Sequence, residues 1–157
     1  MNVIIEPAPE AFSNLIGLHK LLTEAFSGME GRIDPPSSLK KMTLHTLAEK
    51  ARLEHLLLAH IDTRLVGCGF GTAKDETLNL SKLAIAPEFQ RFGLMRRMLE
   101  KFETYANSAG LSSLTLETRI ELTENHKTFE NLGFVKIEET AHPGYDRPTG
   151  FTYLKML

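Results

Sequence analysis

The sequence lacks the features that mark secreted and membrane proteins. Its 157 residues include a single cysteine, so no disulfide can form within the chain. The first residues, MNVIIEPAPEAF, contain neither a basic segment nor a long apolar run, so we expect no secretory signal. No stretch approaches the roughly 20 apolar residues of a membrane-spanning helix. We therefore expect a cytoplasmic protein without a membrane partner.

An excess of charge of either sign is also missing. Lysine and arginine number 18 against 20 acidic residues, which gives a net charge of -2. Proteins that hold nucleic acid usually carry a basic face, so we expect no nucleic-acid partner. The motifs GxxxxGKS/T and GxGxxG are absent, which argues against a nucleoside triphosphatase and a dinucleotide oxidoreductase. The histidines show no metal-ligand spacing, so we expect no metal site.

The sequence does contain an ordinary globular pattern of helical and strand-like segments. Hydrophobic residues make up 42% and charged residues 24%, and the length suits one domain with one core. Apolar periodicity predicts strands at 2–6, 56–61, 65–73, 77–86, 111–118, 134–140 and 151–157. Caps and breakers predict helices at 10–26, at 39–51 after Ser37 or Ser38, at 93–109 before Gly110, and at 124–132 between Thr123 and Gly133.

The predicted strand at 77–86 changes phase along its length. Leu78 and Leu80 are apolar on one phase of the alternation, whereas Leu83 and Ile85 are apolar on the other. A β-bulge near Ser81-Lys82 would return the later side chains to the core face. The alternative is a strand buried on both faces, where phase carries no information.

Three glycines in the preceding strand share one face. Gly67, Gly69 and Gly71 alternate with larger residues, so this face of the strand has no side chains. Another element can therefore approach the backbone closely. We expect close packing of a helix here, in preference to direct ligand contact.

A glycine also opens the long helix in PEFQRFGLMRRMLEKF. Gly93 stands at the start of this helix, where proline, serine or aspartate is more usual. The N–H groups at a helix N-terminus bind anions, and a residue without a Cβ lets the anion approach the backbone. Arg91, Arg96 and Arg97 would add mobile positive charge. The pattern indicates an anion site, although a simple helix entry would also explain a lone glycine.

Two segments resemble the Gcn5-related N-acetyltransferases, the GNAT family. The run LSKLAIAPEFQRFGLMRRML resembles the family's motif A, in which a strand and a turn lead into Q/R-x-x-G-x-G/A. Gln90 and Gly93 match that pattern, and Met95 stands where its last small residue is expected. The run ENHKTFENLGF resembles the family's EN-x-x-x-Y-E-x-L-G-F segment. The predicted order of helices and strands agrees with the family along essentially all 157 residues.

The resemblance implies an α+β fold and a single N-acetyltransferase domain over residues 1–157. The GNAT fold is a central mixed, mostly antiparallel sheet of about seven strands flanked by helices, with a β-bulge in the fourth strand. The implied co-substrate is acetyl-CoA, and no metal is implied. The pantetheine arm would bind the backbone of the bulged strand at Leu83, Ala84 and Ile85. The pyrophosphate would rest on the backbone N–H groups of Arg91, Phe92, Gly93, Leu94 and Met95.

The same resemblance assigns four further positions to the coenzyme A site. Gln90 lies at the start of the phosphate turn, and Arg96 would reach a phosphate. Asn125 would contact the pantetheine arm or the thiol end of coenzyme A. Phe129 occupies the position of the family's tyrosine.

The implied reaction is direct attack of a primary amine on the thioester, with both substrates bound together. A backbone N–H of the bulged strand, here that of Ile85, would stabilise the oxyanion. The family's glutamate on that strand is Asn79 here. Its tyrosine, which protonates the leaving thiolate, is Phe129. Because neither replacement can transfer a proton, the base must come from elsewhere.

Other side chains are candidates for that proton transfer. Glu117, on the strand opposite the bulge, is our candidate catalytic base, together with Ile85 and Asn125 in the catalytic set. Glu121 and His126 are alternatives, and any of the three could instead be a solvated surface residue. Tyr145 could replace the missing phenol or could anchor its loop.

The resemblance to the family implies an acceptor site between two charged loops, SGMEGRIDPPSS and AHPGYDRPTG. Glu30 and Asp34 could meet a cationic amine, and Arg32 and Arg147 could hold a carboxylate. We expect a small-molecule amine as acceptor, and the family's habits allow a homodimer through the final strands. Two alternatives stay open, a non-catalytic acyl-CoA-binding sensor and an interaction module of the same fold. A sensor would bind coenzyme A without turnover.

Overall fold

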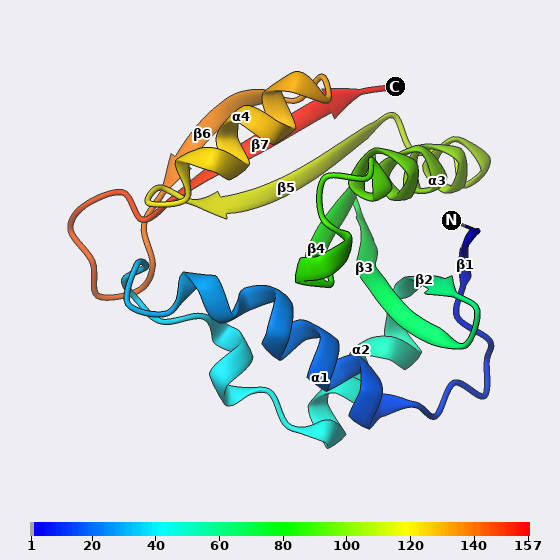
Figure 1. Cartoon of the computed structure of the whole chain (residues 1–157). Coiled ribbons are helices and arrows are strands. Elements are labelled where there is room, and N and C mark those ends of the chain that lie inside the picture. The colour runs from blue at the N-terminus through cyan, green and yellow to red at the C-terminus, as the bar shows by residue number, and fades with distance from the viewer. Residues whose placement is uncertain (1) are drawn as a thin grey trace.

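One seven-stranded sheet organises the chain, in the order β1-β2-β3-β4-β5-β7-β6 (Figure 1). The computed structural model describes residues 2–157. The strands are β1 (Val3–Pro7), β2 (His55–Ile61), β3 (Arg64–Lys74), β4 (Thr77–Ile85), β5 (Ser113–Arg119), β6 (Val135–Thr140) and β7 (Gly150–Met156). Only the β4–β5 pair is parallel among the six neighbouring pairs of the described residues. The predicted mixed, mostly antiparallel sheet is therefore confirmed.

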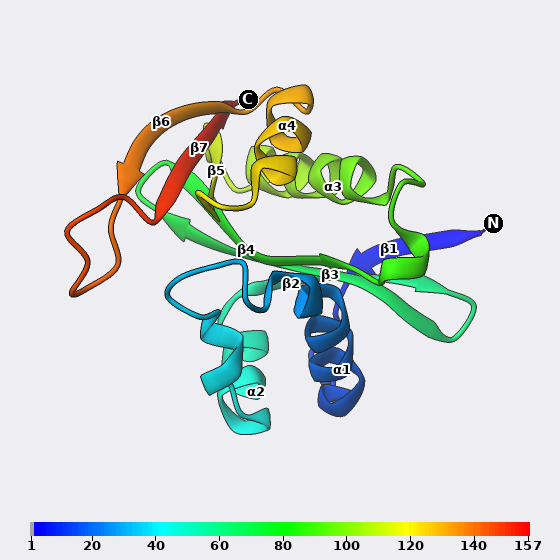
Figure 2. The same ribbon diagram turned by 60° about the vertical axis from the view of Figure 1, so that its left-hand side comes forward.

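Helices cover both faces of this sheet. They are α1 (Leu15–Phe26), α2 (Leu44–Leu53), α3 (Leu94–Ser108) and α4 (Thr123–Asn131), with short 3-10 turns η1 (Ser27–Met29), η2 (Ser38–Lys41) and η3 (Pro87–Phe89). Figure 2 shows α1 and α2 on one side of the sheet and α3 and α4 on the other. Apolar side chains from both layers, including the fully buried Leu18, Phe70, Phe102 and Tyr153, form one continuous core. The predicted single α+β domain is confirmed.

Two predicted helix starts are wrong because a different residue provides the cap. Helix α1 begins at Leu15 and not at residue 10, since the Asn14 side chain accepts a hydrogen bond from the N–H of Gly17. Ser37 caps only the short turn η2. Helix α2 starts later, where Thr43 and Thr46 form a reciprocal capping box. Thr123 is the first residue of α4 and not its cap, and no side chain of the described residues caps that helix.

The two predicted helix ends that are followed by glycine are confirmed. Gly110 and Gly133 follow α3 and α4 with φ values of +76° and +97°, a backbone conformation that favours glycine. After Gly133 the N–H of Phe134 donates to the carbonyl of Phe129 at 3.0 Å. The two phenylalanine rings then meet edge to face, with centroids 5.8 Å apart.

The predicted β-bulge lies at Lys82 and Leu83. Cys68 of β3 pairs with Ala84, but Phe70 pairs with Ser81, so two residues of β4 stand opposite Gly69 alone. Lys82 adopts the left-handed conformation, with a φ of +50°. This extra residue returns Leu83 to the face that packs against α3. A Cβ placed on Gly69 would lie 2.7 Å from Leu83 Cδ2 and 2.9 Å from Phe102 Cε2, so the expected close packing on the glycine face is confirmed.

Candidate functional site

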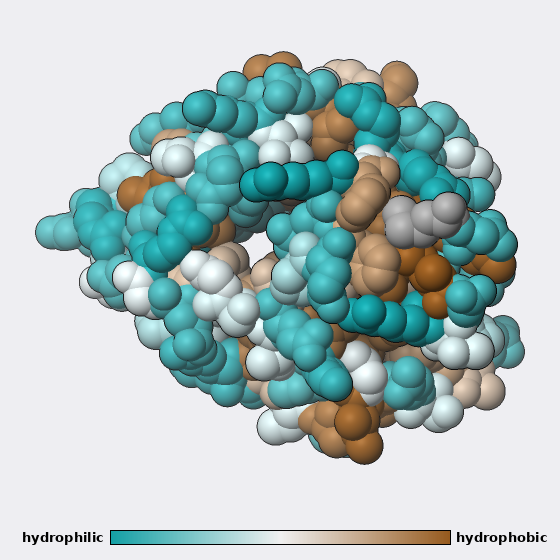
Figure 3. Space-filling view, in the orientation of Figure 1, coloured by the Kyte–Doolittle hydropathy of each residue, from teal (hydrophilic) through white to brown (hydrophobic). Residues whose placement is uncertain are grey.

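The site begins where β4 and β5 separate. Their parallel ladder runs from the Thr77–Ser113 pair to the Leu80–Leu116 pair and ends there. Beyond it lies a cleft of about 650 Å³, lined by both strands, by α4 and by the segment between α1 and α2. Figure 3 shows an opening in the molecular surface in this region. A cleft between separated strands leaves the facing edge of β4 available for a ligand.

Backbone directions at the end of β4 show which groups face this cleft. The N–H of Ala86 donates to the carbonyl of Val66 in β3 at 2.8 Å. Since N–H directions alternate along a strand, the N–H of Ile85 points away from β3, toward the gap beside β5. Leu83 lines the cleft. The backbone groups of Ala84 point toward β3 by the same alternation, because Ala84 pairs with Cys68.

The turn after β4 presents an open helix N-terminus. Gly93 is the N-cap of α3 with a φ of +77°, and no side chain among residues 2–157 caps this helix. A Cβ on Gly93 would have no atom within 4 Å, so the space in front of the helix is open. Arg91 also has a positive φ, of 71°. The side-chain amide of Gln90 donates to the carbonyl of Ile85 at 3.1 Å, which ties the turn to the end of β4.

The other residues of this turn take three different positions. Leu94 is buried, and Met95 packs against the core, so the methionine side chain leaves the turn clear. Phe92 is 59% exposed, and Arg96 is exposed beside it. The expectation that Arg97 adds mobile charge here is wrong, because its guanidinium donates to the carbonyl of Val3 at 3.1 Å.

Helix α4 and the end of β5 form the opposite wall. Asn125 and Phe129 both line the cleft, with Asn125 half-buried and Phe129 packed on Phe134. Thr118 lines it too, and its buried hydroxyl has no hydrogen-bond partner among the described residues. Thr118 was not among the residues predicted from the sequence. The sequence does contain a signal for it, because Thr118 is a polar residue on the same face of the strand as the buried Leu114 and Leu116.

Of the three candidate bases, only Glu117 lines the cleft. Its Oε1 accepts a hydrogen bond from the Thr140 hydroxyl at 2.7 Å. Glu121 instead accepts from the backbone N–H of Asp34, at 3.3 Å, and the His126 Nε2 lies 3.0 Å from the carbonyl of Arg119. Glu121 and His126 thus contact neighbouring loops and strands.

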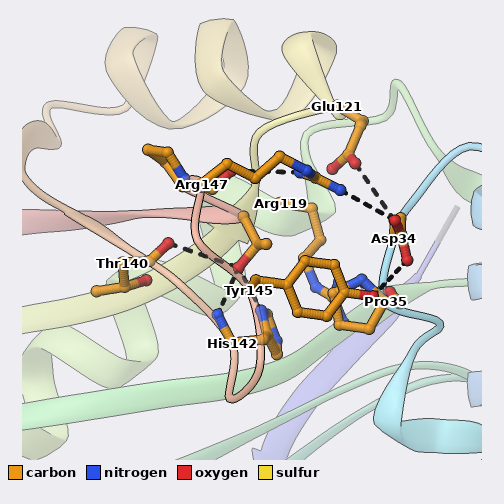
Figure 4. Close-up of polar contacts among 10 residues, drawn as sticks. Asp34, Pro35, Arg119, Glu121, Thr140, His142, Tyr145 and Arg147 are labelled. Atoms are coloured by element: carbon orange, nitrogen blue, oxygen red, sulfur yellow. Dashed lines mark hydrogen bonds and ion pairs between the residues drawn. The ribbon is translucent and has the colours of Figure 1, made fainter.

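A segment that we call the strap, residues 32–36, lines the cleft on the α1–α2 side through Ile33, Pro35 and Pro36, and Figure 4 shows the contacts of its Asp34 and Pro35. Asp34 accepts hydrogen bonds from the Tyr145 hydroxyl at 2.5 Å and from Arg147 at 3.0 Å. Arg119 donates to the carbonyl of Pro35 at 2.6 Å. Hydrogen bonding to Asp34 raises the pKa of Tyr145. The strap therefore joins two loops that are far apart in the sequence.

The same contacts correct the expected roles of the loop charges. Arg32 forms a bidentate pair with Glu124, at 2.7 and 3.0 Å, and Arg147 pairs with Asp34. Neither arginine has its charge available for a ligand carboxylate. Hydrogen bonding to Arg32 lowers the pKa of Glu124 to about 2. Tyr145 acts as a loop anchor, which was one of its two predicted roles.

The remaining sequence candidates lie away from this chemistry. Burial raises the pKa of the Cys68 thiol to about 12, so this residue belongs to the core. Asn79 is exposed. Residues 2–157 contain no group of three or more side chains arranged to hold a metal ion. Among the helices of the same residues, none combines the length and the apolar character of a membrane span.

Comparison with known proteins agrees with this geometry. A family model described as the acetyltransferase (GNAT) family matches residues 15–134. Among solved structures, the chain is similar to the PaiA N-acetyltransferase of Thermoplasma acidophilum in complex with coenzyme A, with a TM-score of 0.84, 15% identity and complete coverage of both chains. A Streptococcus agalactiae acetyltransferase has a TM-score of 0.76 and 20% identity, over 99% of this chain and 98% of the other. An Elizabethkingia anophelis GNAT acetyltransferase with acetyl-CoA bound has a TM-score of 0.71 and 19% identity, over 99% of each chain.

Proposed function

The chain belongs to the GNAT family of acetyltransferases, and from this premise we propose that it transfers the acetyl group of acetyl-CoA to a primary amine of a small molecule. The amine attacks the thioester directly while both substrates are bound. Residues 1–157 act as one N-acetyltransferase domain. The observation that carries this proposal is the separation of β4 from β5 directly beside an uncapped helix N-terminus.

The residues of the turn fit the phosphates of acetyl-CoA. Gly93 leaves open space where a side chain would stand, and the first N–H groups of α3 point into it. The backbone groups of Arg91 through Met95 hold the pyrophosphate, and the exposed Arg96 adds charge. Gln90 acts indirectly, since its amide holds the turn against Ile85.

The cleft fits the pantetheine arm and the thioester. Leu83 and Ile85 offer backbone groups along the free edge of β4. Asn125 and the unpartnered hydroxyl of Thr118 offer polar contacts from the other wall. Phe129 lines the cleft between these walls with an apolar ring.

Two groups of the chain then support the transfer itself. The bound thioester supplies the acetyl group, and its thiolate is the leaving group. The N–H of Ile85 stabilises the oxyanion, as backbone donors do in acyl transfer. Glu117 accepts the proton of the attacking amine, directly or through water. Phe129 donates no proton, so the thiolate leaves unprotonated or takes its proton from solvent.

The strap supports a small acceptor. Asp34 is held by Tyr145 and Arg147, and Ile33, Pro35 and Pro36 of the strap line the cleft, which favours a small acceptor over a folded protein surface. A cytoplasmic location and a homodimer through the final strands belong to the same proposal.

The test is a thiol-release assay with acetyl-CoA and a panel of small amines, run beside calorimetric titration of acetyl-CoA alone. The proposal expects saturable binding and amine-dependent release of one thiol for each acetylated product. Binding without release against every amine would contradict the proposal and favour a sensor. Absence of binding would contradict every role that depends on coenzyme A.

A further inference from the structure

The bulge in β4 places a lysine on the opposite face from its leucine neighbours. By strict alternation Lys82 would share the face of Leu80, which packs toward α3. The extra residue at the bulge reverses this, and the Lys82 Nζ instead donates to the Ser38 hydroxyl of η2 at 2.7 Å. Lys82 therefore lies on the α1–α2 side of the cleft, the same side as the strap.

A second cation lies on that side of the cleft. Arg119 alternates with Thr118 on β5, and its guanidinium donates to the strap carbonyls of Pro35 and Pro36, at 2.6 and 3.2 Å (Figure 4). Both Lys82 and Arg119 line the cleft and are half-buried. These protein contacts are all neutral, so they orient the two cations without neutralising them.

Neither cation is paired with a carboxylate in the described part of the chain. Arg32 and Arg147 of the neighbouring loops each have a carboxylate partner, whereas Lys82 and Arg119 take part in none of the ion pairs within residues 2–157. The lining as a whole has four cations, Lys40, Lys41, Lys82 and Arg119, against the single carboxylate of Glu117. Half-buried cations without counter-charges favour an anionic ligand.

We propose that the acceptor is a small primary amine that also carries a carboxylate, and that the carboxylate binds Lys82 and Arg119. This inference rests on the proposed acetyl transfer and names its substrate class, an amino acid or a close analogue. The carboxylate would be fixed under the strap by charge-assisted hydrogen bonds. Its amine would then face Glu117 and the end of β4. Polyamines and lysine-rich protein tails, which are cationic, would be disfavoured by the same two side chains.

The electrostatics of Lys82 agree with this assignment. Burial, followed by the charges of Lys50 and Arg119, lowers the pKa of Lys82. The carboxylate of Glu54 is already paired with Lys50 of α2, so it is not available as a counter-charge for Lys82. A ligand carboxylate next to Lys82 would favour its charged form and would bind more strongly in return.

The test compares amino acids with the corresponding amino-acid amides in the thiol-release assay, using acetyl-CoA and the full chain. The two acceptors of each pair differ in one charge. The amine of the amide is the weaker base, so less of it is protonated. Without a contact to the carboxylate, the amide should therefore be the better acceptor. We expect at least one amino acid to exceed its amide in kcat/KM by about 10-fold or more, as one charge-assisted contact implies.

The variant Lys82→Met then assigns the preference to this residue, with Lys101→Met on the exposed face of α3 as the control. Lys82→Met should lower kcat/KM for the amino acid about 10- to 100-fold through KM, and should leave the amide and the affinity for acetyl-CoA unchanged. Methionine has a similar length to lysine and would have to adopt the same backbone conformation at this position. Intact binding of acetyl-CoA would show that the variant is folded.

Two results would overturn the inference while acetyl transfer stands. One is that every amide tested reacts as well as its amino acid. The other is an equal fall in kcat for both acceptors in Lys82→Met, which would place the lysine at the reacting atoms. If no amine releases thiol although acetyl-CoA binds, the proposed acetyl transfer fails, and this inference fails with it.

Discussion

The contact between the glycine face of β3 and helix α3 gives a quantitative prediction for Gly69→Ala. The new Cβ would lie 2.7 Å from Leu83 Cδ2 and 2.9 Å from Phe102 Cε2, roughly an ångström inside ordinary contact. Leu83 is only partly buried and can move, but Phe102 is fully buried in the core. Overpacking of this kind costs about 1–3 kcal/mol. For a chain of this size each kcal/mol lowers Tm by about 2–4 °C.

The assay is thermal and urea unfolding of Gly69→Ala beside Gly28→Ala. Gly28 has no atom within 4 Å of an added Cβ and no positive φ, so its substitution should change the free energy of unfolding by less than about 0.5 kcal/mol. Phe102→Leu should relieve part of the Gly69→Ala cost, so that the double variant loses less than the sum of the single ones. Equal stabilities of Gly69→Ala and Gly28→Ala would refute the packing of α3 on this face.

Three further predictions concern catalysis and the strap. Glu117→Gln should lower kcat roughly 10²- to 10⁴-fold without weakening acetyl-CoA binding, and an unchanged kcat would remove Glu117 as the base. Phe129→Tyr should raise the turnover rate where thiolate protonation is limiting, and an unchanged rate would show that it is not. Because hydrogen bonding to Arg32 depresses the pKa of Glu124 to about 2, the pair stabilises the strap above the ordinary value of 4.5 and is lost as the pH falls from there toward 2. The protection factors for hydrogen exchange in the strap, which are corrected for the intrinsic pH dependence of exchange, should therefore fall over that range in the wild type but change little in Glu124→Gln. Constant protection factors down to pH 2 would contradict this.

Periodicity predicted the parts of the fold in which side-chain phase and burial agree. The phase change between Leu80 and Leu83 indicated the bulge, and the bare glycines indicated close helix packing. Gly110 and Gly133 marked the helix ends because a positive φ there favours one residue type. The helix starts were harder to predict, because Asn14 and Thr43 compete with nearby serines and threonines that can form the same caps.

The candidate site was predictable only where a single segment determines it. The turn at Gly93 is local, so the sequence contains most of its geometry. The geometry of the strap is not local, because Asp34 contacts Tyr145 and Arg147, which lie more than 100 residues away in the sequence. The position of Lys82 depends on the bulge itself, which reverses the face that alternation assigns. The sequence of a loop therefore does not reveal which of its charged side chains are paired within the fold and which are available to a ligand.

Calorimetric titration of acetyl-CoA into two matched variants would show whether Gly93 lies under the phosphates of acetyl-CoA. Gly93 and Gly110 begin and follow the same helix, with φ values of +77° and +76°, and neither has an atom within 4 Å of an added Cβ. Alanine should therefore cost similar stability at both, about 1 kcal/mol.

We expect Gly110→Ala to bind acetyl-CoA like the wild type, whereas Gly93→Ala should bind at least about 10-fold more weakly, because the Cβ occupies space that only the ligand fills. Equal affinity in the two variants would mean that no phosphate rests on Gly93 and that this residue is a simple entry to the helix.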